Sequence, residues 1–431
     1  MYENSNVGKL MYDLMEDLFP ICRSITGNGV RDTLKIISKH IPLEIHEVAT
    51  GTQVFDWAIP KEWNIHDAYV IDPAGKKIID FKNSNLHVVS YSIPIHKKIT
   101  LKELKPHIHT LPEMPDAIPY LTSYYHEDWG FCMSHKDFEN LQDGEYEIMI
   151  DSTLENGSLT YGEFFKKGEL EDEFLITCYI CHPSMCNDNL SGTVLTTFLA
   201  KYLEQIKTRF SFRFLFIPET IGSITWLSKN EKKLRNIKYG LVATCLGDSG
   251  SLTYKKTRNG NNEIDRVVKY VLDYSKEDYS IVDFFPSGGS DERQFCSPAF
   301  DLPVGSLVRS MYDKFPEYHT SEDNLNFVKA ENLGDTFSKY SQIIFIVENN
   351  EKYLNLNPKC EPQLGKRGLY RNLGGQKNSN SYQRKLAILW VLNQSDGKNS
   401  LLDIAIKSKL DFELIKQVTD DLLKHNLLKS V

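Results

Sequence analysis

Apolar runs alternate with helical patterns between residues 174 and 348, and this alternation restricts the possible folds more than any other feature of the sequence. Phe174–Ile180 is an almost unbroken apolar run, as expected of a strand buried on both faces. Buried strands that alternate with helices are typical of α/β proteins. The sequence therefore predicts a doubly wound, mostly parallel sheet. We expect its strands at Phe174–Ile180, Phe212–Ile217, Tyr239–Leu246 and Leu302–Val308, and its helices at Ser191–Ile206, Ile221–Asn230, Glu263–Ser275 and Asn326–Val347.

Two regions differ in character from this α/β region. Residues 43–149 contain short alternating runs such as His87–Tyr91, which are separated by turn residues and predict a β-rich unit. Residues 359–431 contain three short helical patterns, an arrangement that resembles a winged-helix module. We therefore assign residues 1–42 and 150–358 to the α/β domain, 43–149 to a β-rich domain and 359–431 to a C-terminal module.

Composition argues against a membrane protein and against a secreted one. No apolar run in the 431 residues approaches the length of about 18–20 that a spanning helix needs. The eight cysteines are scattered over a long chain, and the N-terminal segment lacks the pattern of a secretion signal. We therefore expect no membrane segment and a location in the reducing cytoplasm.

The charge is distributed unevenly along the chain, whose net charge is -8. Residues 359–431 hold 13 Lys or Arg against 7 Asp or Glu, a surplus of six positive charges. Such a surplus suits nucleic acid, but the expected last helix, Asp411–Leu423, has Lys416 as its only basic residue. We therefore expect the C-terminal module to bind a protein partner or to self-associate, and we do not expect nucleic acid as the partner.

Residues that can bind a metal follow successive predicted strands. His182 and Asp188 follow the first strand, Glu219 the second and Asp248 the third, while His319 precedes the last long helix. Each alone has an ordinary alternative, such as a helix cap for Glu219 or a turn residue for Asp248. Because ligands of such sheets bind beyond the carboxyl ends of the strands, we expect the five side chains to converge. Imidazole and carboxylate ligands suit zinc or a similar ion.

The segment Asp188-Asn189-Leu190-Ser191-Gly192, together with His182, Glu219, Asp248 and His319, resembles the zinc aminopeptidase family. The whole chain is also similar to a bacterial group of polysaccharide-biosynthesis proteins with an aminopeptidase-like domain. The similar stretches are Arg23-Ser24-Ile25-Thr26-Gly27, Asp56-Trp57, Cys181-His182-Pro183, Pro218-Glu219-Thr220-Ile221-Gly222-Ser223, Gly289-Ser290-Asp291-Glu292 and Tyr318-His319-Thr320-Ser321. The resemblance implies that the β-rich domain is inserted into an aminopeptidase-like domain, and that a winged helix follows. It also implies one or two zinc ions, or another divalent metal, held by His182, Asp188, Glu219, Asp248 and His319, with Glu219 as the catalytic residue.

The sequence departs from this family at its pair of glutamates. The family uses one glutamate as the general base and the next as a metal ligand, whereas this chain has Glu219-Thr220. Either Glu219 is the base and one metal lacks a ligand, or Glu219 is a ligand and Asp291 or Glu292 takes the role of the base. Ser184 also replaces an aspartate of the family. A site with a single metal, or one without hydrolytic activity, remains open.

Three further residues are candidates for binding substrate. Arg309 can bind a substrate carboxylate or form a surface ion pair, Tyr312 can line the pocket or pack, and Asp291 is the third candidate. One or two aromatic residues of the β-rich domain can face the metal cleft, while the others fill its core.

We expect a cytoplasmic, metal-dependent hydrolase that cleaves an amide bond in a short peptide or an amide-bearing sugar intermediate by metal-activated water. The alternatives are a catalytically inactive binding protein, and a ligand-sensing regulator that uses its winged helix.

Overall fold

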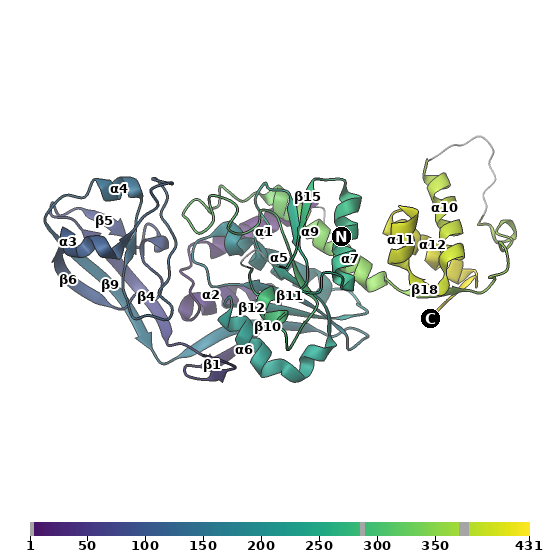
Figure 1. The fold of residues 1–431 in the computed structure, drawn as a ribbon, viewed down its shortest axis with the longest axis horizontal. Coiled ribbons are helices and arrows are strands. Elements are labelled where there is room, and N and C mark those ends of the chain that lie inside the picture. Colours follow the sequence, from purple (N-terminus) through teal and green to yellow (C-terminus); the bar gives the residue numbers. More distant parts are fainter. Residues whose placement is uncertain (1–3, 285–288, 370–378) are drawn as a thin grey trace. The chain divides into compact units, whose positions relative to one another are not determined.

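The structure is a computed structural model that describes residues 4–284, 289–369 and 379–431 (Figure 1). The chain divides into two compact units. The first consists of Met1–Asp265 and Asp278–Lys339, and the second of Arg266–Glu277 and Tyr340–Val431. Within the described residues, every helix is too short or too polar to cross a bilayer.

An eight-stranded sheet forms the centre of the first unit, with the order β1-β10-β12-β11-β13-β16-β14-β15. The four strands β12, β11, β13 and β16 are parallel to one another, and β14 is parallel to β15, whereas the pairs β1–β10, β10–β12 and β14–β16 are antiparallel. The prediction of a doubly wound, mostly parallel sheet is thereby confirmed. The strands are β1 (Glu44–Ala49), β10 (Ser158–Lys166), β11 (Glu173–Tyr179), β12 (Ser211–Ile217), β13 (Ile237–Ala243), β14 (Leu252–Lys255), β15 (Tyr279–Val282) and β16 (Val304–Val308).

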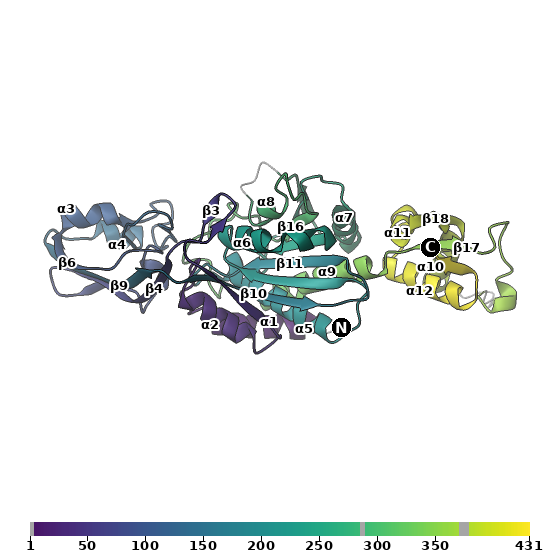
Figure 2. The ribbon, with the colours of Figure 1, turned by 90° about the horizontal axis from the view of Figure 1, so that it is seen from below.

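Helices cover both faces of this sheet (Figure 2). One face carries α1 (Asn4–Leu18), α2 (Asn28–Ile37) and α5 (Ser191–Glu204), and the other carries α6 (Ile221–Asn230) and α8 (Glu292–Phe295). Gly192 permits the start of α5 to lie directly on β13, because a Cβ atom there would come within 2.0 Å of the Ala243 carbonyl oxygen. Two longer helices, α7 (Glu263–Ser275) and α9 (Ala330–Asn349), contribute residues to both units.

The β-rich region forms an antiparallel sheet of its own, in the order β5-β4-β9-β6. Alternate apolar residues such as Val70, Ile79 and Ile148 form its core. The predicted boundary at residue 43 differs from the strand pairing, since β1 belongs to the central sheet. β1 is mostly exposed and alternates like the short strands that follow, so its pattern does not show which sheet it joins. The elements are β4 (Glu62–Ile71), β5 (Lys77–Asp80), β6 (Ile95–Thr100), β9 (Glu145–Glu155), the hairpin β2 (Gln53–Val54) and β3 (Trp57–Ala58), the pair β7 (Ile108–His109) and β8 (Phe131–Cys132), and the short helices α3 (Leu101–Leu104) and α4 (His135–Glu139).

Besides its parts of α7 and α9, the described part of the second unit contains the α-helices α10, α11 and α12 and a three-stranded sheet of the order β18-β17-β19. The Ser400 and Asp411 side chains accept hydrogen bonds from backbone N–H groups in the first turns of α11 and α12, as helix caps do. Because β17 pairs with both other strands, this sheet begins before the predicted boundary at residue 359. The elements are α10 (Ser379–Gln394), α11 (Leu401–Ser408), α12 (Phe412–Lys424), β17 (Lys352–Asn355), β18 (Asp396–Ser400) and β19 (Leu428–Ser430).

Candidate metal centre

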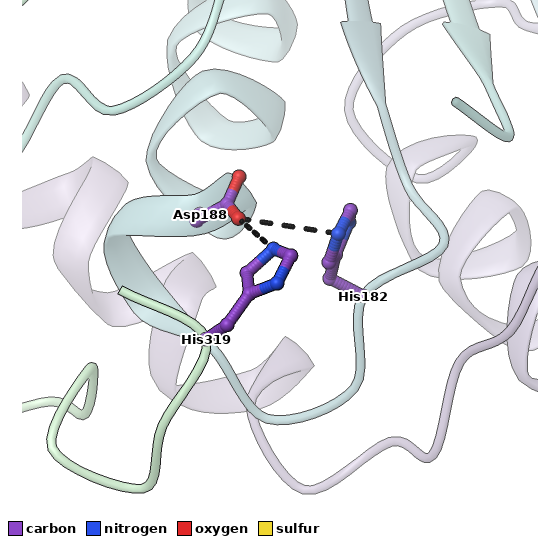
Figure 3. Close-up of side chains that lie close together, drawn as sticks. All are labelled: His182, Asp188 and His319. Atoms are coloured by element: carbon purple, nitrogen blue, oxygen red, sulfur yellow. Dashed lines mark ion pairs between the residues drawn. The ribbon is translucent and has the colours of Figure 1, made fainter. Parts of the chain in front are cut away.

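The structure brings three of the five predicted metal-binding residues together at the carboxyl end of β11 (Figure 3). His182, Asp188 and His319 each offer one ligand atom, and these atoms lie within 4.8 Å of one another. Asp188 Oδ2 lies 3.0 Å from Nε2 of His319 and 3.9 Å from Nε2 of His182. Two residues come from the loop between β11 and α5, and the third comes from a loop more than 120 residues later in the chain. A shared site therefore exists only in the folded chain.

Two atoms of this cluster are buried without a hydrogen-bond partner. They are Asp188 Oδ2 and His319 Nε2, which lie 3.0 Å apart. Buried polar atoms are nearly always paired, and each exception calls for an explanation. A cation held between the two atoms would satisfy both. The residues present therefore fit a divalent metal of the zinc type, for which imidazole and carboxylate are common ligands.

The electrostatic environment also suits a cation. Burial lowers the pKa of His182 to about 4, so its imidazole is neutral and can offer a lone pair. Burial alone would raise the pKa of Asp188, but the neighbouring imidazoles and the Tyr179 hydroxyl outweigh that effect and lower it to about 2. The site thus presents one carboxylate and a neutral imidazole, which are the ionisation states that metal ligands require.

Tyr179 and Asp323 position Asp188, and sequence reasoning did not identify either of them. The Tyr179 hydroxyl donates to Asp188 Oδ1 and lies 2.6 Å from Thr244 Oγ1. The Asp323 carboxylate accepts the backbone N–H groups of Asn187 at 2.6 Å and Asp188 at 2.8 Å. Burial raises the pKa of Asp323 to about 8, although these N–H groups favour the ionised form. The one available signal was that Asp323 lies four residues after His319.

The inserted domain holds the loop that carries His319. Tyr120 N–H donates to the His319 carbonyl oxygen at 2.8 Å, and Ser321 N–H donates to the Ile118 carbonyl oxygen at 2.9 Å. The Tyr120 ring packs 5.4 Å from the His182 ring and 5.3 Å from the His319 ring, between centroids. His319 has a positive φ of 55°, which is uncommon for a residue other than glycine. Pairing with the insert therefore stabilises a strained backbone at this ligand.

Glu219 lies beside the three residues but outside their group of mutually close ligand atoms. Its Oε1 accepts a hydrogen bond from Ser290 Oγ at 2.8 Å, and its Oε2 lies 3.8 Å from His182 Nε2. Burial and the negative charges of Asp291 and Asp188 raise the pKa of Glu219 well above its usual value. Glu219 thus lies beside the cluster without belonging to it.

Asp248 lies apart from this cluster, in contrast to the prediction. Its oxygens accept hydrogen bonds from Asn187 Nδ2 at 2.8 Å, Gly250 N–H at 2.6 Å and Ser310 Oγ at 2.6 Å. The sequence placed the end of the strand at Leu246, but β13 ends at Ala243 and Asp248 lies five residues beyond it. The side chain from this loop that approaches the cluster is Thr244, through Tyr179.

The three predicted substrate-binding residues are occupied elsewhere. Arg309 is buried and donates to Thr336 Oγ1 at 3.0 Å and to the Gly250 carbonyl oxygen at 3.1 Å. It also pairs with Asp335 at 2.5 Å, so its position is that of an internal structural contact. Tyr312 is buried, with its hydroxyl 3.2 Å from Glu292 Oε1.

Asp291 is fully buried beneath the Glu219 loop. Its Oδ1 accepts hydrogen bonds from Thr220 N–H and Ser223 Oγ, both at 2.8 Å. Burial raises the pKa of Asp291 to about 7. Asp291, Arg309 and Tyr312 are absent from the described lining of the pocket beside the cluster. The structure therefore does not support direct contact between these three residues and a substrate in that pocket.

A pocket of about 460 Å³ opens beside the cluster. Its lining includes His182, Glu219 and His319 together with aromatic residues of the inserted domain. This volume is within the range of sites that hold small molecules. The full lining consists of Ile25, Trp57, Tyr120, Leu121, Thr122, Tyr124, Tyr125, Cys181, His182, Glu219, Thr220 and His319.

Two family profiles match this chain. A domain of unknown function, DUF4910, matches residues 12–350, and a winged helix-turn-helix family matches residues 351–430. A Clostridium acetobutylicum protein is 60% identical over 428 residues, which cover 99% of this chain and 98% of that protein. Its provisional name is polysaccharide biosynthesis protein with aminopeptidase-like domain.

Solved structures also resemble this fold. A crystal structure from Clostridium acetobutylicum, provisionally named a peptidase, has 59% identity and a TM-score of 0.94 and covers 99% of this chain and 97% of that chain. BSAP, a zinc aminopeptidase from Bacillus subtilis, has a TM-score of 0.59 at 14% identity and covers 80% of this chain and 95% of that chain. A Peptidase M28 precursor from Shewanella amazonensis has a TM-score of 0.53 at 14% identity and covers 80% of this chain and 97% of that chain. At such identities the last two show a common fold alone.

Proposed function

Because this chain belongs to the DUF4910 family and has an aminopeptidase-like fold, we propose that it is a metal-dependent hydrolase. The resemblance to polysaccharide-biosynthesis proteins with an aminopeptidase-like domain is confirmed. The proposed reaction is cleavage of an amide bond in a short peptide or an amide-bearing sugar intermediate. One observation carries this proposal: Asp188 Oδ2 and His319 Nε2 are buried beside His182 without hydrogen-bond partners.

We propose that the centre holds one cation, with zinc as the first candidate. Asp188 can bridge two cations only if both of its oxygens face them. The Tyr179 hydroxyl donates to Oδ1, so Oδ2 alone faces the two imidazoles. The oxygens of Asp248, another of the five predicted ligands, are occupied by internal hydrogen bonds. His182, Asp188 and His319 are thus the proposed ligands.

The proposed chemistry divides between the cation and Glu219. When bound, the cation supplies Lewis-acid chemistry, since it polarises an amide carbonyl and lowers the pKa of a water molecule. Glu219 accepts the proton of the attacking water and returns it to the leaving amine, which is general base and then general acid catalysis. Ser290 holds Oε1 of Glu219, and this contact orients the carboxylate toward the pocket. The base role resolves the ambiguity of the single glutamate, because three other residues supply the ligands.

Metal content tests the ligands directly. After loading with zinc and removal of free metal, elemental analysis of the wild type should give about one ion per chain. The variants His182→Ala and Asp188→Ala should each lose this bound zinc ion. His66→Ala serves as the matched control, because His66 lies on the exposed side of β4 with 60% of its side chain accessible. A wild type without stoichiometric metal, or variants that retain it, would contradict the proposal.

Hydrolysis tests the role of Glu219 and separates the enzyme from a catalytically inactive binding protein. The missing second glutamate favours that alternative. We expect the metal-loaded wild type to hydrolyse aminoacyl-arylamides or dipeptides, and Glu219→Gln to lose this activity while it keeps the metal. A metal-loaded wild type without activity on any such amide would favour the binding protein.

For the C-terminal module we propose a protein partner or self-association rather than nucleic acid. Basic residues in and beside α12 are neutralised within the module: Lys416 pairs with Asp420 at 2.6 Å, and Arg384 pairs with Asp421. A surface that binds phosphates needs unpaired positive charge. We also propose a cytoplasmic location, since all eight cysteines are free thiols, as is usual in a reducing compartment.

A further inference from the structure

Four aromatic residues of the inserted domain line the pocket together with the proposed metal ligands His182 and His319. We call Trp57, Tyr120, Tyr124 and Tyr125 the aromatic wall. Trp57 comes from the hairpin of β2 and β3, and the three tyrosines come from the loop that pairs with residues 319–321. The insert therefore contributes both a support for one metal ligand and the surface that faces it.

Contacts among its members preorganise the aromatic wall. The Trp57 and Tyr125 rings meet edge to face at 5.5 Å between centroids, and Tyr124 meets Tyr125 in the same manner at 6.3 Å. The hydroxyl oxygens of Tyr120 and Tyr124 are 2.8 Å apart, within hydrogen-bond distance. Tyr91 supports Tyr124 from behind, with an edge contact at 5.3 Å. A rigid aromatic surface loses little conformational entropy on binding, which favours affinity.

Part of the aromatic wall remains accessible. Tyr125 is 54% exposed, and Leu121 beside it is 38% exposed. Large apolar side chains that are exposed in a concave pocket with a few polar groups mark a ligand-binding surface. Aromatic faces attract other flat apolar faces, including aromatic rings. The shape thus suits a ring-bearing group that lies against the wall while an amide reaches the metal ligands.

The charge of the lining restricts that group further. Among the lining residues that the structure describes, none is Lys or Arg, and Glu219 is an acid. The nearby Lys61 pairs with Glu127 at 2.8 Å. A phosphate or carboxylate placed against the wall, out of reach of the proposed cation, would lose its hydration without gaining a positive partner among the described lining side chains. Anionic groups are therefore disfavoured at this position.

We propose that the aromatic wall is the specificity site, and that it binds an uncharged, flat-faced group next to the scissile amide and rejects anionic groups. The shared chemistry is a ring with an apolar face, found both in N-acylated sugars and in aromatic amino-acid residues. The position of this group next to a scissile amide rests on the proposed function, whereas binding to the wall does not require catalysis.

Matched pairs of probes test the proposal through binding alone, measured by saturation-transfer NMR with the full chain. N-acetyl-L-tyrosine amide is compared with N-acetyl-L-tyrosine, which differs by one negative charge. Methyl N-acetylglucosaminide is compared with its 6-phosphate. We expect at least one neutral probe to bind and its anionic partner to bind about tenfold more weakly or not at all. The pair that shows the effect distinguishes a peptide source from a sugar source.

Substitutions in the aromatic wall test whether the probes bind there. Trp57→Ala and Tyr125→Ala should each weaken binding of the neutral probe about three- to tenfold, because each removes one aromatic contact. Trp129→Ala is the matched control, since Trp129 lies in the same domain, stacks on His107 and does not line the pocket. Zinc content should remain unchanged in all three variants. A loss of metal in the wild type would thus count against the proposed function and not against the wall.

Three results would overturn the proposal. Binding of neither neutral probe is the first, and equal or stronger binding of the anionic partners is the second. The third is wild-type affinity in both Trp57→Ala and Tyr125→Ala. A folded state that matches the wild type by circular dichroism ensures that weaker binding reflects the contact removed.

Discussion

Two neighbouring groups of similar residues have opposite hydrogen-bonding states. The convergent cluster, His182, Asp188 and His319, has two buried atoms without a partner. The saturated cluster, Asp248 and Arg309, has its charges surrounded by donors and acceptors from the same chain. An unsatisfied buried polar atom costs about 1–3 kcal/mol of stability. This difference is the one expected if the convergent cluster binds the proposed cation and the saturated cluster stabilises the fold.

The largest expected effect is on metal binding by the convergent cluster. Asp188→Asn keeps the shape of the side chain but removes its charge, so affinity for zinc should fall at least about a hundredfold. With free zinc at about 100 times the dissociation constant, the wild type should gain about 2.7 kcal/mol of unfolding free energy. The variant should gain about 0.4 kcal/mol or less. Chemical denaturation with and without zinc measures the gain in unfolding free energy of each protein. Equal stabilisation of the two proteins by zinc would contradict metal binding by Asp188.

The saturated cluster should respond in the opposite way. Asp248→Ala leaves the buried donors of Asn187, Gly250 and Ser310 unpaired, and should lower the unfolding free energy by about 3 kcal/mol. The folded protein should still bind one zinc ion per chain. If Asp248→Ala were as stable as the wild type but lost its metal, Asp248 would be a ligand and the division between the clusters would fail.

A smaller effect is expected at Tyr179, which links Asp188 to Thr244. Tyr179→Phe removes the hydroxyl that occupies Asp188 Oδ1, and should weaken zinc binding about tenfold, as for other residues that orient a ligand. Calorimetric titration should show one site in both proteins. Two sites of similar affinity in the wild type would contradict the single-cation proposal.

The smallest effect is expected at Ser290, which contacts Glu219 and no metal ligand of the convergent cluster. Loss of one hydrogen bond to a carboxylate is worth about 1 kcal/mol, so Ser290→Ala should lower kcat about fivefold. KM and zinc content should stay the same. A changed zinc content would place Glu219 among the ligands rather than beside them.

Sequence patterns located the convergent cluster because its members follow strand ends or lie in a distinctive motif. The buried run before His182 fixed the end of β11 to within one residue, and the prediction of the sheet was confirmed. Asp248 was placed wrongly relative to the cluster because its strand ends three residues earlier than the apolar pattern suggests. Hydrophobicity reports burial, and residues 244–246 are buried without belonging to the strand.

Other parts of the site depend on contacts that no local pattern records. Tyr179 looks like one more residue of a buried strand, yet its hydroxyl binds Asp188. Asp323 supports the ligand loop from a position 135 residues away. The aromatic wall can be identified only when it is known which rings of the insert line the pocket. Trp57 lines it, whereas Trp63 lies in the core. These roles follow from the tertiary structure.

The convergence of His182, Asp188 and His319 on one cation is tested most directly by a crystal of zinc-loaded protein measured at the zinc absorption edge. The account predicts a single anomalous peak in the first unit, within bonding distance of all three side chains, with Asp248 outside its coordination sphere. An anomalous peak bound to Asp248, or zinc-loaded crystals without a peak at the convergent cluster, would contradict it.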